Sequence, residues 1–199
     1  EQERQVAAVN ARIKQSLDAV SANVMVADKD YTIVYVNPAL RQMFVEVANE
    51  LRKVLPAFDP ARLEGQSMDI FHRRSEHQRR MMDRLTGNHT SEQKIGALTM
   101  KITSTPVFDA EGARIGTAIE WVNRTQEVAT EKEVSDVVTH ALDGDLTTRV
   151  QEAGKTGFFA VLAKGMNSLL GNFAEVVQTI AGATGQVRTG AEEISKGNT

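Results

Sequence analysis

The chain has 199 residues, of which 41% are hydrophobic and 5% aromatic, and it carries a net charge of −3 at pH 7. This length accommodates one or two domains, and the acidic balance provides no basic surface for nucleic acid, which we therefore exclude as a partner. The absence of cysteine excludes disulfides, thiolate metal sites and cysteine nucleophiles. No apolar run reaches the roughly 18 residues that cross a bilayer, so we expect a cytoplasmic chain; a membrane anchor before residue 1 stays open.

The first third of the chain predicts a helix, a hairpin and a second helix. In residues 1–20, valines and an isoleucine recur at spacings of three, four and seven, which is typical of a helix. Residues 22–36 change to β-branched and aromatic residues around an Asp-Lys-Asp turn, which indicates a strand–turn–strand hairpin. Asn37 as N-cap and Pro38 in the first turn begin the next helix. Prolines and a glycine then make residues 45–70 a mixed segment.

The middle of the chain predicts one more short helix and three strands. The helix covers residues 75–85, and we expect Gly87 to end it. The strands cover residues 89–95, 98–108 and 114–123. Because strand runs and helix runs are segregated, we expect an α+β domain built on a five-stranded antiparallel sheet with short helices.

The last third of the chain is helical, and its hydrophobic pattern predicts an assembly. Helix resumes near Gln126 and breaks around Gly144, and a polar connector covers residues 147–157; we interpret its glycine as a mark of a flexible relay rather than of an ordinary loop. Eleven later positions keep an alternating spacing of three and four, which is typical of the a and d seam of a coiled coil. They are Phe159, Leu162, Met166, Leu169, Phe173, Val176, Ile180, Ala183, Val187, Gly190 and Ile194. Because a seam needs a partner helix, we expect a parallel homodimer, and we expect the sequence to continue beyond Thr199.

Residues 22–124 resemble a PAS domain. The features that match are the first hairpin, the Val-Asn-Pro-Ala-Leu segment at residues 36–40, the short helices and the three closing strands. Within that fold, Gly-Gln-Ser-Met-Asp-Ile-Phe-His at residues 65–72 and Glu-His-Gln-Arg at residues 76–79 are similar to the haem-binding PAS domains of aerotaxis-type bacterial chemoreceptors. This resemblance implies that the domain binds haem b and senses a diatomic gas: oxygen, which we favour, or carbon monoxide.

The resemblance also assigns roles to single residues. His72 matches the histidine that ligates the haem iron, and His77 matches a second histidine of the same segment and is the alternative ligand. Trp121 matches the tryptophan that donates a hydrogen bond to the gas, and an indole N–H, which only donates, suits an acceptor with partial negative charge. For each residue a local role stays open: a histidine that caps the chain, or a tryptophan in the hydrophobic core. On one continuous helix the two histidines would point about 140° apart, which argues against a shared zinc ion.

Other residues would complete a haem pocket. The apolar lining would come from Met81, Met82, Leu85, Ile102 and Ile119. Arg73 and Arg74 would bind the haem propionates, since guanidinium groups bind carboxylates in a bidentate manner, or would form part of a solvated face. We expect the remaining histidines, His89 and His140, at the surface.

The helical part has resemblances of its own. Residues 126–180 resemble a HAMP relay, and residues 186–198 resemble the opening of a methyl-accepting signalling helix. Together the resemblances imply a chemoreceptor whose HAMP helices form a parallel four-helix coiled coil in the dimer, with a chemotaxis kinase and an adaptor as downstream partners. PAS domains commonly end their last strand in Asp-x-Thr, whereas here the segment reads Asn123-Arg124-Thr125. We expect Asn123 and Thr125 to couple the sheet to the next helix without the full charge of an aspartate.

The sequence therefore predicts four segments and no enzyme. Residues 1–20 would be a helical linker, 21–125 a PAS sensor, 126–180 a HAMP relay and 181–199 the start of a signalling helix. The chain shows no phosphate-binding glycine loop and no nucleophile–base spacing, so catalysis has no support. The alternative to a haem sensor is a PAS module without haem, used for dimerisation or for binding a small metabolite.

Overall fold

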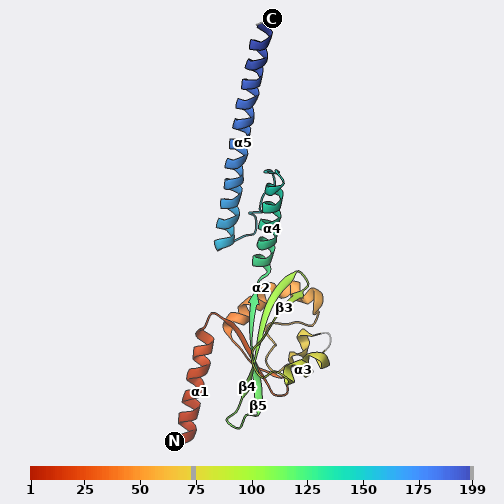
Figure 1. The fold of residues 1–199 in the computed structure, drawn as a ribbon. Coiled ribbons are helices and arrows are strands. Elements are labelled where there is room, and N and C mark those ends of the chain that lie inside the picture. The colour runs from red at the N-terminus through yellow and green to blue at the C-terminus, as the bar shows by residue number, and fades with distance from the viewer. Residues whose placement is uncertain (73–74, 198–199) are drawn as a thin grey trace. The chain divides into compact units, whose positions relative to one another are not determined.

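The computed structural model describes residues 1–72 and 75–197 and divides the chain into two compact units, Glu1–Thr125 and Gln126–Thr199. The first unit holds a five-stranded antiparallel sheet in the order β2-β1-β5-β4-β3 (Figure 1). Its strands are β1 (Asn23–Asp28), β2 (Ile33–Val36), β3 (His89–Ile95), β4 (Leu98–Phe108) and β5 (Arg114–Asn123). The sheet expected from the sequence is confirmed, and its last three strands have the predicted bounds.

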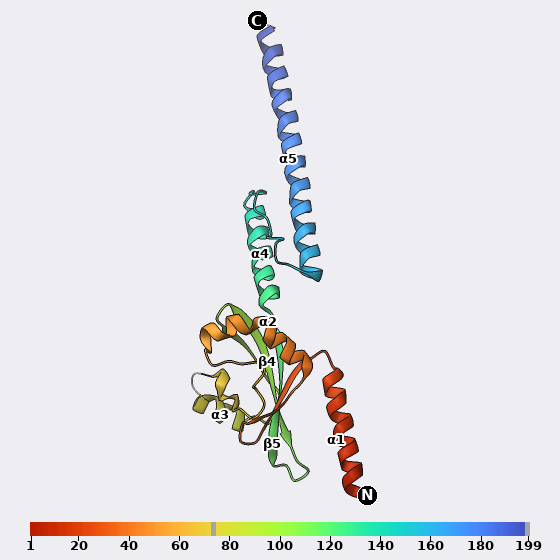
Figure 2. The same cartoon turned by 180° about the vertical axis from the view of Figure 1, so that it is seen from behind.

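Four helical segments accompany this sheet. They are α1 (Gln2–Ala19), α2 (Pro38–Val54), the 3-10 helix η1 (Met68–Phe71) and α3 (Ser75–Asp83). The side-chain oxygen of Asn37 accepts hydrogen bonds from the backbone N–H groups of Leu40 and Val24, each at 3.0 Å. One side chain therefore caps α2, as predicted, and also joins this helix to β1. Figures 1 and 2 show α2 and α3 beside the sheet and α1 extending away from it.

Two helices differ from their predicted bounds. α2 continues to Val54, through a segment that we expected to be mixed, because one face of it stays in the core along most of its length. The buried residues of that face are Leu40, Met43, Phe44, Ala48 and Leu51. α3 ends at Asp83 rather than at Gly87, because the N–H of Leu85 already bonds the oxygen of Met82 in a tighter three-residue turn.

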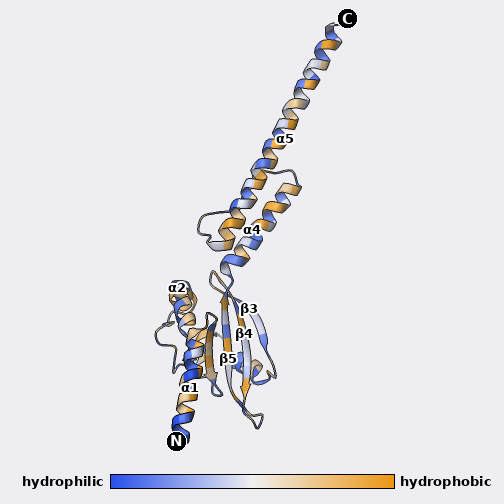
Figure 3. Cartoon of the chain, turned by 90° about the vertical axis from the view of Figure 1, so that its left-hand side faces the viewer, coloured by the Kyte–Doolittle hydropathy of each residue, from blue (hydrophilic) through white to orange (hydrophobic). Residues whose placement is uncertain are grey.

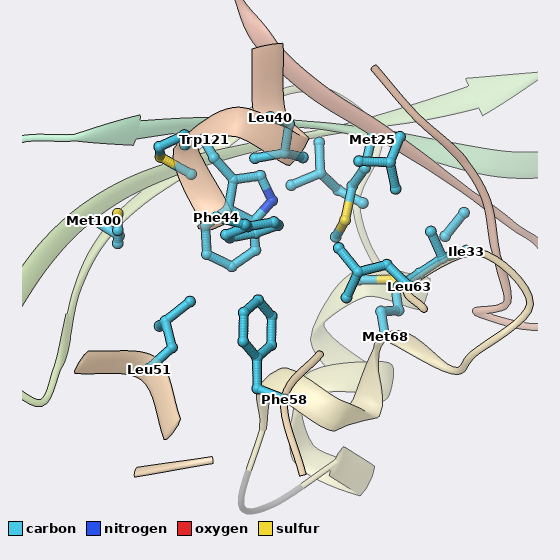
Figure 4. Close-up of a cluster of buried hydrophobic side chains, with 14 of the residues drawn as sticks. Met25, Ile33, Leu40, Phe44, Leu51, Phe58, Leu63, Met68, Met100 and Trp121 are labelled. Carbon is cyan, nitrogen blue, oxygen red and sulfur yellow. The ribbon is translucent and has the colours of Figure 1, made fainter. Parts of the chain in front are cut away.

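The core of the first unit lies between the inner face of the sheet and these helices. Successive residues of a strand point to opposite faces, so the buried residues of β1 and of the second half of β5 alternate with less buried ones. Figure 4 shows Phe44 of α2 beside Trp121 of β5, and their rings meet edge to face with centroids 5.3 Å apart. Phe58 meets Phe44 in the same manner at 5.3 Å. Aromatic rings thus join α2, the segment after it and the sheet.

The second unit consists of two helices and a connector. α4 (Thr125–Leu142) begins at the last residue of the first unit, and α5 (Gly157–Gly197) has 41 residues. A small buried cluster joins α4, the connector and α5; its members are Val137, Val150, Ala163 and Leu170. The unit therefore has a hydrophobic centre only along the first part of α5.

The connector between α4 and α5 makes specific contacts with both helices. The side chain of Asn167 accepts a hydrogen bond from the N–H of Val150 and donates one to its oxygen, both at 2.9 Å. Lys155 forms an ion pair of 2.9 Å with Glu133, and the Lys155 side chain is only 7% exposed. We expected a flexible segment here, but polar contacts hold it against both α4 and α5.

The predicted coiled-coil seam is mostly exposed in a single copy of the chain. Ala163 and Leu170, which face α4, do not belong to the seam, whereas Leu169, Phe173 and Val176 do and are at least half exposed. Figure 3 shows hydrophobic residues recurring along α5. Among the described helices, none combines the length and the hydropathy that spanning a membrane requires.

Candidate functional site

A cavity of about 590 Å³ lies between the inner face of the sheet and the segment that contains η1 and α3. Strand pairing builds its floor, because Ile102 of β4 stands opposite Trp121 of β5, and Met25 of β1 stands opposite Ile119. All four of these residues line the cavity. The volume lies in the range of about 300–1,000 Å³ that is usual for small-molecule and cofactor sites.

The cavity is apolar at its buried end and polar at its rim. Met25, Ile119 and Trp121 are each at most 3% exposed. The rim comes from polar side chains of α3 and β3, namely His77, Gln78, His89, Ser91 and Gln93. Such a division suits a ligand with a large apolar body and a polar edge.

Trp121 provides the one unsatisfied donor of this site. Its Nε1 is buried and, among the described residues, is the only buried side-chain nitrogen or oxygen without a hydrogen-bond partner. The ring contacts Phe44 (Figure 4) and Phe71, whose ring centroids lie 5.3 Å and 5.1 Å away. An indole N–H only donates, and leaving it buried without an acceptor costs about 1–3 kcal/mol. Trp121 is thus a core residue that lines the cavity and whose N–H has no acceptor in the structure.

His72 has the environment of a neutral imidazole ligand. It follows η1, is half-buried, and its Nδ1 lies 3.2 Å from the backbone oxygen of Met68. A carbonyl oxygen only accepts, so the Nδ1 must carry the proton and the lone pair stays on Nε2. Burial lowers the pKa of His72, which keeps the ring neutral near pH 7. Haem iron takes a neutral imidazole whose other nitrogen is held by such a hydrogen bond, so the residues present fit this group.

The other histidines do not all lie where we expected them. His77 is an exposed rim residue of α3, whereas His72 follows η1, so the two do not share one helix and their predicted separation of 140° does not apply. His89 was expected at the surface but is half-buried and lines the cavity; its alternation with Ser91 along β3 was the signal that could have shown this. His140 is exposed, as expected. Within residues 1–72 and 75–197, no three histidines or carboxylates gather to hold a bare metal ion.

The structure brings three of the five residues of the predicted apolar lining to the cavity. Met81, Ile102 and Ile119 line the cavity. Met82 is 1% exposed and belongs to the core instead, and Leu85 packs against that core. Neighbouring helical residues point about 100° apart, so only one of two adjacent methionines can face the cavity. The predicted propionate contacts, Arg73 and Arg74, lie outside the described residues.

Asn123 and Thr125 join the end of the sheet to the start of α4. The side-chain oxygen of Asn123 accepts from the N–H of Thr125 at 3.0 Å and from its hydroxyl at 2.6 Å. The Thr125 hydroxyl oxygen in turn accepts from the N–H of Thr99 at 3.0 Å. Arg124 pairs with Glu92 of β3 at 2.8 Å. Asn123 therefore makes this connection by neutral hydrogen bonds, without a carboxylate.

Known proteins similar to this chain include chemotaxis receptors and PAS domains. The chain is 46% identical over 164 residues to the methyl-accepting chemotaxis protein McpB of Pseudomonas aeruginosa, a match that covers 82% of this chain and 24% of that protein. It thus spans about a quarter of the length of the curated relative, whose name describes a chemotaxis protein and not an enzyme, as the sequence predicts. A structure of the Aer2 receptor from Vibrio cholerae, described as a dual PAS-heme oxygen sensor, is 38% identical, with a TM-score of 0.47 over 51% of this chain and 93% of that one. A PAS domain from Colwellia psychrerythraea is 13% identical, with a TM-score of 0.43 over 59% and 98%.

A family model for the PAS fold matches residues 17–129, more than half of the chain. The matched range begins within α1 and ends within α4, so it contains all five strands and every residue of the cavity wall. The whole five-stranded sheet and the helices α2, η1 and α3 therefore lie within the matched range. The chain belongs to the PAS fold family.

Proposed function

We propose that the chain is the sensory and relay part of a methyl-accepting chemoreceptor, and that its PAS unit binds haem b and senses a diatomic gas, with oxygen as the first candidate. The observation that carries the proposal is the unpaired N–H of Trp121 in the wall of an apolar cavity. The name of the relative supports the chemotaxis part. The histidine-bearing segment that resembles haem-binding PAS domains supports the choice of cofactor.

Each group of the cavity has a distinct task in this proposal. Haem iron, when bound, supplies the reversible binding of a diatomic gas. His72 would hold the cofactor through Nε2, because Nδ1 is already bonded to the oxygen of Met68. Met25, Ile102 and Ile119 would exclude water from the apolar part. The N–H of Trp121 would donate to the gas, which favours oxygen, since oxygen accepts more negative charge on binding than carbon monoxide does.

The helical unit would relay the signal as a HAMP-like dimer in the cytoplasm. β5 ends at Asn123 and α4 begins at Thr125, so a change at Trp121 reaches the relay helix within a few residues. The exposed seam of α5 would pack against a second copy, and a chemotaxis kinase and adaptor would act downstream. Gas binding can shift such a relay only by its difference in affinity for the two helix arrangements.

A visible absorption spectrum of the purified chain tests the cofactor. We expect haem to bind with a Soret band that shifts on reduction and on addition of oxygen or carbon monoxide. His72→Ala should remove the haem or leave it loosely held, and His77→Ala, the matched control on the rim, should do less. The reverse order would move the ligand to His77. A wild type that binds no haem would leave a PAS module for dimerisation or for a small metabolite.

Trp121→Phe separates a gas sensor from a passive haem-binding domain. The substitution keeps an aromatic ring but removes the N–H donor, so haem should stay bound while oxygen affinity falls. A net hydrogen bond of about 0.5–1.5 kcal/mol corresponds to a several-fold loss of oxygen affinity, and carbon monoxide affinity should change less. Equal losses for both gases would indicate a collapsed pocket, and unchanged oxygen affinity would leave Trp121 with its core role alone.

A further inference from the structure

Tyr31 has a left-handed backbone conformation, which residues other than glycine rarely adopt. It lies in the turn between β1 and β2 with a φ of 67°, and it is the one non-glycine residue with positive φ among the residues that the structure describes. Asp28 builds this turn, because its carboxylate accepts from the N–H of Asp30 at 2.9 Å and of Thr32 at 2.8 Å. A bulky residue at positive φ is strained, so the surroundings must stabilise it. The strain points to a role for the tyrosine side chain.

Two guanidinium groups lie over the ring of that side chain. Tyr31 is 7% exposed, and the guanidinium carbons of Arg79 and Arg114 lie 5.0 Å and 5.5 Å from the centroid of its ring. The Tyr31 hydroxyl donates to the carboxylate of Asp83, and Arg114 pairs with the same carboxylate at 3.2 Å. Cations over an aromatic face and a hydroxyl on a carboxylate both stabilise the ring in this position.

These residues connect four separate parts of the first unit. Arg79 and Asp83 belong to α3, Arg114 begins β5, and Tyr31 lies in the β1–β2 turn. Arg79 also donates from Nε to Asp69 of η1 at 3.2 Å. We call these five residues the Tyr31 cluster. It joins the two helical segments of the cavity wall to the strand that carries Trp121.

The Tyr31 cluster stabilises α3, a short helix with few apolar contacts to the core. α3 has nine residues, and an isolated helix of that length is unstable in water. Its side chain most deeply buried in the core is Met82. Exposed ion pairs alone contribute little, and the Asp83 side chain is 61% exposed. The buried side chain of Tyr31 therefore adds a contact that α3 needs beside the packing of Met82 on the core.

We propose that Tyr31 is a positioning residue that fixes α3 and η1 on the sheet and so sets the cavity wall around His72. Where it concerns haem, this inference rests on the proposed function; the position of α3 does not depend on it. η1 leads directly to His72, and α3 carries His77 and Met81 on the cavity. Loss of the Tyr31 contacts would thus make α3 and η1, which form one wall of the cavity, more mobile while the strands stay folded.

Tyr31→Phe tests this, with Tyr35→Phe as the matched control. Tyr35 is the only other tyrosine and also donates its hydroxyl to a carboxylate, that of Asp18 at 2.6 Å, but Asp18 and the Lys14 over its ring both belong to α1. Without haem, amide hydrogen exchange in α3 should become roughly tenfold faster in Tyr31→Phe, with β4 and β5 unchanged. With haem, transfer to excess apomyoglobin should accelerate by a similar factor. Tyr35→Phe should change neither.

A double-mutant cycle separates positioning from general destabilisation. Asp83→Ala removes the carboxylate acceptor of the Tyr31 hydroxyl and leaves it only the backbone oxygen of Arg79 at 3.1 Å. Tyr31→Phe should therefore accelerate exchange in α3 less in the Asp83→Ala background than in the wild type. Additive effects, or faster exchange spread over all strands, would overturn the inference. If the wild type binds no haem, the proposed haem sensing is wrong. The exchange experiment on α3 would still decide whether Tyr31 positions that helix.

Discussion

The two units differ in how completely one copy of the chain buries its own hydrophobic residues. In the first unit, eighteen buried hydrophobic side chains form one cluster between the sheet and its helices. In the described part of the second unit only four do, although α5 alone has 41 residues. Val176, Ile180 and Val187 of α5 are each more than half exposed.

This difference separates a unit that buries its core within one chain from a unit that, in our proposal, packs against a partner. Stability of a few kcal/mol is the small remainder of large opposing terms, so a unit with four buried hydrophobic residues has little reserve of its own. The first unit should therefore unfold at a midpoint independent of protein concentration. The second should become more stable as concentration rises, because association stabilises it by mass action.

The largest effect should come from the completed core. Phe44 is fully buried and contacts three other aromatic rings, so Phe44→Ala should lower the free energy of unfolding of the first unit by about 3–5 kcal/mol. Val45→Ala, one position later and 57% exposed, should change it by about 0.5 kcal/mol or less. Fluorescence of Trp121, the only tryptophan, reports this unit during denaturation. Equal losses from both variants would mean that the core is not built around Phe44.

The incomplete unit should respond through association instead. Val176 and Val177 are equally exposed in one copy, 54% each, but only Val176 belongs to the seam. Val176→Lys places a charge where the partner helix would pack, so the dimer dissociation constant should rise on the order of a hundredfold. Val177→Lys should leave it nearly unchanged. Sedimentation equilibrium measures both, and a monomeric wild type at high concentration would exclude the dimer.

The sequence predicted best what depends on near neighbours in the chain. β3, β4 and β5 have the predicted bounds, because alternation and turn residues specify strands locally. The Asn37 cap is likewise a local signal. The alternating spacing predicted a coiled-coil seam along α5. It did not show that Ala163 and Leu170, outside the seam, are the residues that pack against α4.

Contacts between distant residues were missed for a physical reason. Tyr31 and Arg114 lie 83 positions apart, and only the folded sheet brings them together. α2 continues to Val54 because its contact with the core outweighs the local pattern. Met81 and Met82 are chemically alike, and only the orientation of α3 decides that one lines the cavity and the other the core.

The smallest effect should appear where the second unit relies on polar contacts. After α4, the carboxylate of Asp145 accepts from the hydroxyl of Thr147 at 2.6 Å, from its N–H at 2.8 Å and from the hydroxyl of Thr148 at 2.9 Å. These hydrogen bonds lower the pKa of Asp145 from 3.8 to about 2. A carboxyl whose pKa is lowered by folding stabilises the fold above its unfolded pKa and loses that contribution as pH falls through the folded value.

Asp145→Asn should therefore destabilise the second unit at neutral pH, and the difference from wild type should close as pH falls from 3.8 to about 2. Asp143→Asn, also exposed and two positions earlier, is the matched control and should leave the stability of the second unit at neutral pH nearly unchanged. Thermal unfolding followed by the helical circular dichroism of α4 and α5 measures all three, with the proteins compared at equal concentration and the comparison repeated at several concentrations. The second unit is the one expected to respond to concentration, so an acid effect that vanishes when concentration is raised would assign it to association. A difference that persists at every concentration would assign it to the Asp145 contacts within one copy.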